Sequence, residues 1–206
     1  QGLHVVWIGN PAEPEMMGFV EAGADVWDFT VSGGLAYILD YDGTLTVVDV
    51  ADPAAPVVVG ELVPGWEHGF FDVIVGDGLL FLSSVGDPGL SIVDASDPTA
   101  PVIVGTYNEN IDIPNAMAYR DDRLFLADSF LRLHIVDVSV PESPMRVDMK
   151  QLTDTAEALA LLEDWILIAT SNGLESKTWN TGPDTESLGS YLPGGHADRV
   201  EIGRDI

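Results

Sequence analysis

The chain has 206 residues, of which 34 are acidic and 8 are basic, and its formal net charge is −26. This balance argues against nucleic-acid binding, because phosphate contacts need clustered Lys and Arg and the sequence has no such cluster. Cysteine is absent, so disulfides and thiolate metal sites are excluded. No apolar run has the length of a membrane span, and we expect a chain that is not inserted in a membrane.

One segment recurs along the whole chain. It reads LTVVDVADPAAPVVVG from Leu45 and LSIVDASDPTAPVIVG from Leu90, and further copies begin at Leu3, Leu133 and Leu174. The spacing of 41 to 45 residues between the leading leucines lies in the range of propeller blades. We therefore interpret residues 1–206 as a single repeat array.

The apolar runs within each period are short, rich in Val and Ile, and separated by Gly, Pro and Asp, which is typical of strands. The first complete period predicts strands at 25–31, 35–39, 45–50 and 57–62, joined by Gly-, Asp- and Pro-containing turns. Later periods predict strands at 72–75, 79–82, 90–93, 102–107, 116–119, 124–126, 133–138, 145–149, 156–162, 165–169 and 196–202. Four antiparallel strands in about 43 residues form a propeller blade. The expected fold is all-β, a β-propeller of four-stranded antiparallel blades with about four to five repeats.

These residues resemble the LVIVP repeat family, whose units carry an Ile-Val-Asp-Val strand, an Asp-Pro-x-x-Pro turn and a Val-x-Val-Gly strand. The positions that carry the resemblance are Asp49, Asp94 and Asp137; Pro11, Pro53, Pro98 and Pro141; Pro14, Pro56, Pro101 and Pro144; and Gly18, Gly60, Gly105 and Gly189. The repeats depart from the pattern at Trp7 and Thr178 in place of Asp, and at Asp148 in place of Gly. The resemblance implies a propeller of bacterial or archaeal surface proteins, an extracellular or cell-surface location, and an interaction surface rather than chemistry.

The order of the strands also predicts an incomplete ring. The chain starts on a third strand at Leu3 and reaches its end just after the first strand expected at 196–202. If these ends closed a five-bladed ring, one blade would lack its second strand and leave backbone groups unpaired. We therefore expect an open arc of about four blades that belongs to a larger propeller, whose remaining blades on the same polypeptide would be its partners.

The recurring aspartates Asp49, Asp94 and Asp137 could be read as a ring of metal-binding carboxylates. An aspartate just ahead of a turn commonly accepts hydrogen bonds from the backbone N–H groups of that turn, and a role repeated in every blade is usually a folding role. The structural interpretation is therefore the favoured one.

Loops that differ between repeats are the better binding candidates. In a propeller, the loop before the first strand and the loop between the second and third strands share one face around the channel. The segment Gly65-Trp66-Glu67-His68-Gly69 places an aromatic ring, a carboxylate and an imidazole between glycines, and its counterpart contains His196 and Asp198. The candidate binding residues on this face are Trp66, Glu67, His68, His196, Asp198, Asp25 and Asp128. We expect a protein or carbohydrate partner there.

Two functions fit these features. The first is a non-catalytic interaction or scaffold module, and the alternative is a propeller hydrolase or lyase that uses the channel-face histidines and carboxylates. No nucleophile elbow, glycine-rich phosphate loop or metalloprotease helix occurs in the sequence, so no catalytic residue is assigned.

The turn Asp40-Tyr41-Asp42-Gly43 resembles the start of a calcium loop, because Ca²⁺ prefers several carboxylate oxygens in a short segment. An expected strand begins at Leu45, however, and the late acidic ligand of an EF-hand is missing, so a hairpin turn is the favoured interpretation. We expect no cofactor, with calcium at Asp40 and Asp42 as the alternative. His4 and His134 share one position of the repeat and are interpreted as packing residues.

Overall fold

The computed structural model describes residues 2–23, 25–64, 70–179, 189–191 and 200. These residues form strands and contain no helix, which confirms the all-β prediction. None of them belongs to a helix that is long and apolar enough to span a membrane. The strand expected at 196–202 lies outside the described residues.

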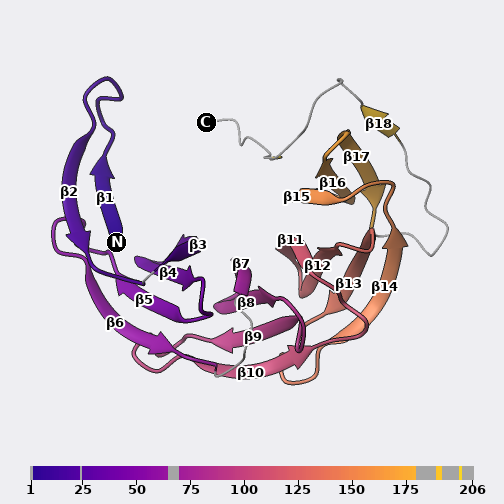
Figure 1. Cartoon of the computed structure of the whole chain (residues 1–206), viewed down its shortest axis with the longest axis horizontal. Coiled ribbons are helices and arrows are strands. Elements are labelled where there is room, and N and C mark those ends of the chain that lie inside the picture. The colour runs from indigo at the N-terminus through magenta and orange to yellow at the C-terminus, as the bar shows by residue number, and fades with distance from the viewer. Residues whose placement is uncertain (1, 24, 65–69, 180–188, 192–199, 201–206) are drawn as a thin grey trace. The chain divides into compact units, whose positions relative to one another are not determined.

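The strands of each sheet follow one another along the chain, so every sheet is an up-and-down meander (Figure 1). A two-stranded sheet consists of β1 (Leu3–Trp7) and β2 (Glu15–Val20). The four-stranded sheets consist of β3 (Val26–Ser32), β4 (Leu35–Asp40), β5 (Leu45–Asp49) and β6 (Val57–Leu62); β7 (Phe70–Gly76), β8 (Leu79–Ser84), β9 (Leu90–Asp94) and β10 (Val102–Tyr107); β11 (Pro114–Arg120), β12 (Arg123–Asp128), β13 (Arg132–Asp137) and β14 (Met145–Gln151); and β15 (Ala156–Leu162), β16 (Trp165–Thr170), β17 (Gly173–Thr178) and β18 (Gly189–Tyr191).

The four-stranded sheets have the topology and length predicted for propeller blades, and each predicted strand within them agrees with the structure to within two residues at either end. Tight hairpins set these boundaries. Gly33 and Gly34 have φ of 60° and 83°, and Asp77 and Gly78 have φ of 47° and 84°. Positive φ at both central residues is the requirement of the type I′ turn, whose twist matches that of antiparallel strands.

The chain divides into two compact units, residues 1–84 with 91–104 and residues 85–90 with 105–206. In the first unit, buried residues of β4 and β5 such as Leu39 and Leu45 form one cluster with Leu80 and Leu82 of β8. The opposite face of the β3–β6 sheet packs against the β1–β2 sheet, through a second cluster that contains Ala36, Ile38 and Val48 together with Leu3 and Val20. In the second unit, the cluster that joins the last two sheets contains Phe125, Ala127, Leu133, Ile135, Ile166 and Ile168.

Burial on both faces explains why the middle strands read as continuous apolar runs rather than as an alternating pattern. Within the repeated strand motif, Val48, Ile92, Val93, Ile135 and Val136 are buried, whereas Val50, which lies just past the end of β5, is half-buried.

The glycine of one repeat lies against the first proline of the next repeat. A Cβ added at this glycine would overlap the carbonyl oxygen of the proline, and the pairs are Gly18 with Pro53, Gly60 with Pro98 and Gly105 with Pro141. None of these glycines has a left-handed φ, so the position requires glycine for a close approach between backbones and not for a turn. The repeat motif therefore records a packing contact between successive sheets.

Candidate functional site

The aspartates that end the third strands hold the turns that follow them. The Oδ1 atoms of Asp49, Asp94 and Asp137 each accept a hydrogen bond from the backbone N–H two residues further on, at 2.9, 2.8 and 3.0 Å. The backbone N–H of Ser96 is the main cause that lowers the pKa of Asp94. The structural interpretation of these recurring carboxylates is confirmed.

Asp128, one of the candidate binding residues, is fully buried at the end of β12. Its Oδ1 accepts hydrogen bonds from the backbone N–H groups of Phe130 and Arg132, at 3.1 and 3.0 Å. Its Oδ2 accepts one from Nε of Arg132 at 2.9 Å and lies 3.1 Å from Nε2 of His134. The carboxylate thus joins the β12–β13 turn to the strand that follows.

The electrostatics of Asp128 fit an anchoring role. Burial by itself would raise the pKa of Asp128, but hydrogen bonds from His134 and Arg132 and the charge of Arg132 outweigh it and lower the pKa to about 2. His134 is fully buried, and its Nδ1 has no hydrogen-bond partner among the described residues. The interpretation of His134 as a packing residue therefore captures its burial but misses its contact with Asp128.

Asp40 and Asp42 occupy the β4–β5 hairpin, where calcium was the alternative. Both carboxylates accept a hydrogen bond from the backbone N–H of Thr44, at 2.8 Å for Asp40 and 3.1 Å for Asp42. A hydrogen bond with the Asp40 carboxyl is the main cause that lowers the pKa of Asp42, and Thr44 adds to it. The geometry is that of a hairpin in which the carboxylates cap the turn. Among the described residues, no group of three His, Asp or Glu side chains is placed to hold a metal ion.

The loop before the first strand and the loop after the second strand lie together at one end of a blade, as predicted. In the β3–β6 sheet, the backbone N–H of Tyr41 donates to the carbonyl oxygen of Asp25 at 2.8 Å. In the β11–β14 sheet, the N–H of Ser129 donates to the carbonyl of Ile113 at 2.9 Å, and its hydroxyl donates to Oδ2 of Asp112 at 2.6 Å. Loop aspartates are thus part of the connection between these loops.

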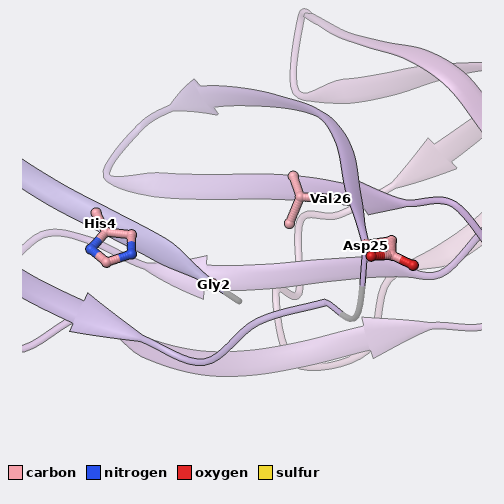
Figure 2. Close-up of a pocket in the computed structure, with 4 residues that line it drawn as sticks. All are labelled: Gly2, His4, Asp25 and Val26. Carbon is pink, nitrogen blue, oxygen red and sulfur yellow. The ribbon is translucent and has the colours of Figure 1, made fainter.

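A pocket of about 330 Å³ opens at this end of the first unit, lined by Gly2, His4, Asp25 and Val26. In Figure 2, His4 lies at the left, Gly2 and Val26 lie near the middle of the view, and Asp25 lies at the right. The His4 ring contacts the ring of Phe19, with centroids 4.7 Å apart. His4 is exposed, so its interpretation as a packing residue is only half right: it packs on one side and lines a pocket on the other.

Two residues next to the pocket-lining Asp25 and Val26 carry exposed aromatic rings, although neither is itself a lining residue. Trp27 follows Val26 on β3 and is 51 % exposed, and Tyr41, hydrogen-bonded to the loop at Asp25, is 69 % exposed. Their ring centroids lie 6.0 Å apart, with the planes tilted by 52°. We call the six residues Gly2, His4, Asp25, Val26, Trp27 and Tyr41 the first-blade surface. Of these, only Asp25 was a binding candidate from the sequence.

The other binding candidates, Trp66, Glu67, His68, His196 and Asp198, lie outside the described residues. The hydrolase or lyase alternative depends on His68 and His196 and stays a prediction for the same reason.

Sequence reasoning missed the first-blade surface and the contact between Asp128 and His134, although a signal for the second was available. The last residue of the second strand and the residue after the leading leucine of the third strand are polar and buried in successive blades. The pairs are Asp40 with Thr46, Ser84 with Ser91, Asp128 with His134, and Thr170 with Glu175. A comparison of equivalent positions across the repeats would have found this buried polar row.

The family model described as the LVIVD repeat matches residues 23–62 and 84–109. The first stretch contains the whole β3–β6 sheet and the second contains β9 and β10. The final letter of the family description corresponds to the aspartate that ends β5 and β9. The sequence analysis named this repeat family LVIVP, and that resemblance is confirmed over these two stretches.

Solved structures with a similar fold share little sequence with the chain. A protein from Lactobacillus plantarum aligns with a TM-score of 0.74 at 13 % identity, over 87 % of this chain and 61 % of its own. A functionally unknown protein from Desulfotomaculum acetoxidans DSM 771 aligns with a TM-score of 0.73 at 10 % identity, over 88 % and 60 %. The computationally designed Ika8 protein aligns with a TM-score of 0.71 at 11 % identity, over 92 % and 57 %.

At these identities the likeness concerns the fold alone, and it agrees with four-stranded propeller blades. The chain spans about three fifths of the length of these three proteins. No curated protein matches the sequence.

Proposed function

We propose that the chain is a non-catalytic interaction module of a secreted or cell-surface protein, which binds a protein or glycan partner through loops at the pocket end of its blades. The observation that carries the proposal is the first-blade surface, where the lining residues Asp25 and Val26 of a pocket have Trp27 and Tyr41, with exposed aromatic rings, as neighbours. Exposed Trp and Tyr offer large contact areas at low conformational cost, and such residues dominate binding energy at interfaces. The location rests on the resemblance to repeats of surface proteins.

The described carboxylates at this end of the blades support binding over catalysis. Asp128 is buried and surrounded by donors, Asp40 and Asp42 cap a turn, and Asp112 bonds the hydroxyl of Ser129. A general acid or base must reach its substrate within hydrogen-bonding distance. Carboxylates that hold backbone N–H groups in a turn act in folding, and they leave recognition to the side chains around the pocket.

The proposal is tested by screening the purified chain against a glycan array and a peptide library, with the Trp27→Ala variant screened beside it. We expect specific binders from one of the libraries, and binding that is lost in the variant. Trp7→Ala is the matched control, because Trp7 is a similarly exposed tryptophan of β1 that lies at the other end of that strand from Gly2.

A panel of ester, glycoside and polysaccharide lyase substrates addresses the enzymatic alternative. Turnover that disappears in both His68→Ala and His196→Ala would overturn the proposal of a non-catalytic module. So would the absence of any binder, or binding that Trp27→Ala and Trp7→Ala weaken equally.

A further inference from the structure

The charges of the chain are distributed unevenly along the sequence. Arg120 is the first Lys or Arg in the sequence, and the 119 residues before it contain 18 Asp and Glu residues. The carboxylates of this segment therefore have no Lys or Arg of the same segment to pair with. Their field extends over about 10 Å at 0.1 M salt and attracts positively charged groups.

The first-blade surface lies within this acidic segment. Its pocket is lined by Asp25 and Val26 among others, and the rings of Trp27 and Tyr41 contact each other, with centroids 6.0 Å apart and planes tilted by 52°. A cation within about 6 Å of an aromatic centroid is attracted by the negative face of the ring, and two rings with a carboxylate are the arrangement by which proteins recognise ammonium groups. Trp27 lies two residues after Asp25, and the backbone N–H of Tyr41 donates to the Asp25 carbonyl, so a guest that reached all three side chains would meet both kinds of attraction.

The apolar part of the surface fits a long side chain. Val26 lines the pocket, and it is 43 % exposed. Lys and Arg carry aliphatic stems that cover apolar surface while the charged head group remains at a polar site. The stem of such a residue would lie on Val26 and Trp27, with its head group near the Asp25 carboxylate.

We propose that the first-blade surface docks a Lys- or Arg-bearing segment of a partner protein, held by cation–π contacts with Trp27 and Tyr41 and by the Asp25 carboxylate. This proposal rests on the proposed function and specifies the chemistry of the partner. A neutral glycan would make no use of the Asp25 carboxylate that lines the pocket, and a polyanion would be repelled by it. A bare metal ion is a poorer guest, because the described residues offer no group of three ligands.

The experiment measures binding of oligo-arginine, oligo-lysine, oligo-glutamine and oligo-glutamate peptides of equal length by fluorescence anisotropy. We expect the two basic peptides to bind, with an affinity that falls as salt is raised, and the other two not to bind. Asp25→Asn, Trp27→Ala and Tyr41→Ala should each weaken binding about tenfold, the factor that corresponds to losing one good contact to a charged group.

Matched controls separate a site from general attraction to an acidic protein. Glu61→Gln removes one negative charge, as Asp25→Asn does, but from an exposed position on β6. Trp7→Ala removes an exposed tryptophan of the same unit. Both should leave the affinity within about twofold of the parent chain, because general electrostatic attraction depends on total charge and hardly on position. Circular dichroism confirms that each variant is folded.

The outcomes distinguish this inference from the proposed function. Equal weakening by Asp25→Asn and Glu61→Gln would overturn the cationic docking site, and so would binding of oligo-glutamine with the affinity of the basic peptides. A neutral glycan or uncharged peptide that binds at Trp27 would also overturn the inference, while leaving the interaction module in place. No binder of any class at Trp27 would overturn both.

Discussion

The contact between Gly105 and Pro141 predicts that a single methyl group destabilises the chain. A Cβ placed on Gly105 would overlap the carbonyl oxygen of Pro141 and lie 2.9 Å from its carbonyl carbon and 3.4 Å from Cα of Glu142. All three atoms belong to backbone, so no flexible side chain can swing away. An alanine at this position must therefore move the proline turn away from β10, or bend β10 itself.

The cost follows from the usual effect of overpacking, which is about 1–3 kcal/mol when extra atoms force backbone shifts. For a chain of this size, each kcal/mol lowers the melting temperature by roughly 2–4 °C. We therefore expect Gly105→Ala to melt about 2–12 °C below the parent chain, when unfolding is followed by far-UV circular dichroism.

Thr106→Ala is the matched control, because Thr106 is the next residue of β10 and is exposed. Surface substitutions of this kind change stability by less than about 0.5 kcal/mol. A Gly105→Ala variant that melts together with Thr106→Ala would refute the argument that backbone contact requires the glycine.

Three further predictions concern electrostatics. Asp128→Asn should destabilise the chain by about 3 kcal/mol in chemical denaturation, because the half-buried guanidinium of Arg132 and the buried imidazole of His134 lose their charged partner. The pKa of Asp128 is about 2 in the folded chain against an ordinary 3.8, so its stabilising contribution is complete above pH 3.8 and is lost as the pH falls towards 2. In this pH window the parent chain should lose its stability advantage over Asp128→Asn. A stability difference that stays constant with pH would contradict the assignment. Moderate sodium chloride should raise the melting temperature, because it screens repulsion among 34 acidic side chains, and a steady fall would contradict it.

The architecture was predictable from the sequence because the same physical constraints recur in every period. Val and Ile runs bounded by Gly and Pro predict the strands, and Asp49 and Asp94 stand ahead of turns whose N–H groups need acceptors. A feature that occurs in several copies is usually a constraint of the fold, and the hydrogen bonds to the following backbone N–H groups show this role for the turn aspartates.

The first-blade surface could not be predicted in this way because it does not repeat. It brings His4 of β1 together with Asp25 and Val26 around one pocket, and their proximity depends on how the β1–β2 sheet packs against the next sheet. The periodic pattern gives each sheet its strands but carries no information on which exposed side chains of neighbouring sheets meet. Such non-repeating side chains are also where a propeller scaffold acquires its specificity.

Asp148 occupies the repeat position that is glycine in Gly18, Gly60 and Gly105. It therefore tests whether glycine is required by the strand that carries it or by the proline turn that packs against it. Asp148 pairs with Ile135 next to a register shift, as Gly60 pairs with Val47 next to a register shift, so the irregular strand pairing itself accepts a Cβ. The following copy has Gly182 where the other copies have their first proline. Asp148 thus stands in a copy whose following copy has no proline at that position, which agrees with the packing argument.

A substitution at this position separates the two explanations. If the strand required glycine, Asp148→Gly would stabilise the chain. If the neighbouring proline requires glycine, Asp148→Gly brings no gain in stability. It loses the 2.9 Å ion pair with Lys150, and the added glycine increases the entropy of the unfolded chain, which costs about 0.5–1 kcal/mol of folding free energy. We expect a fall in melting temperature of roughly 1–4 °C. Asp148→Ala, which removes the same ion pair but keeps a Cβ, should fall less, and a rise for Asp148→Gly would show that the strand and not its neighbour selects glycine.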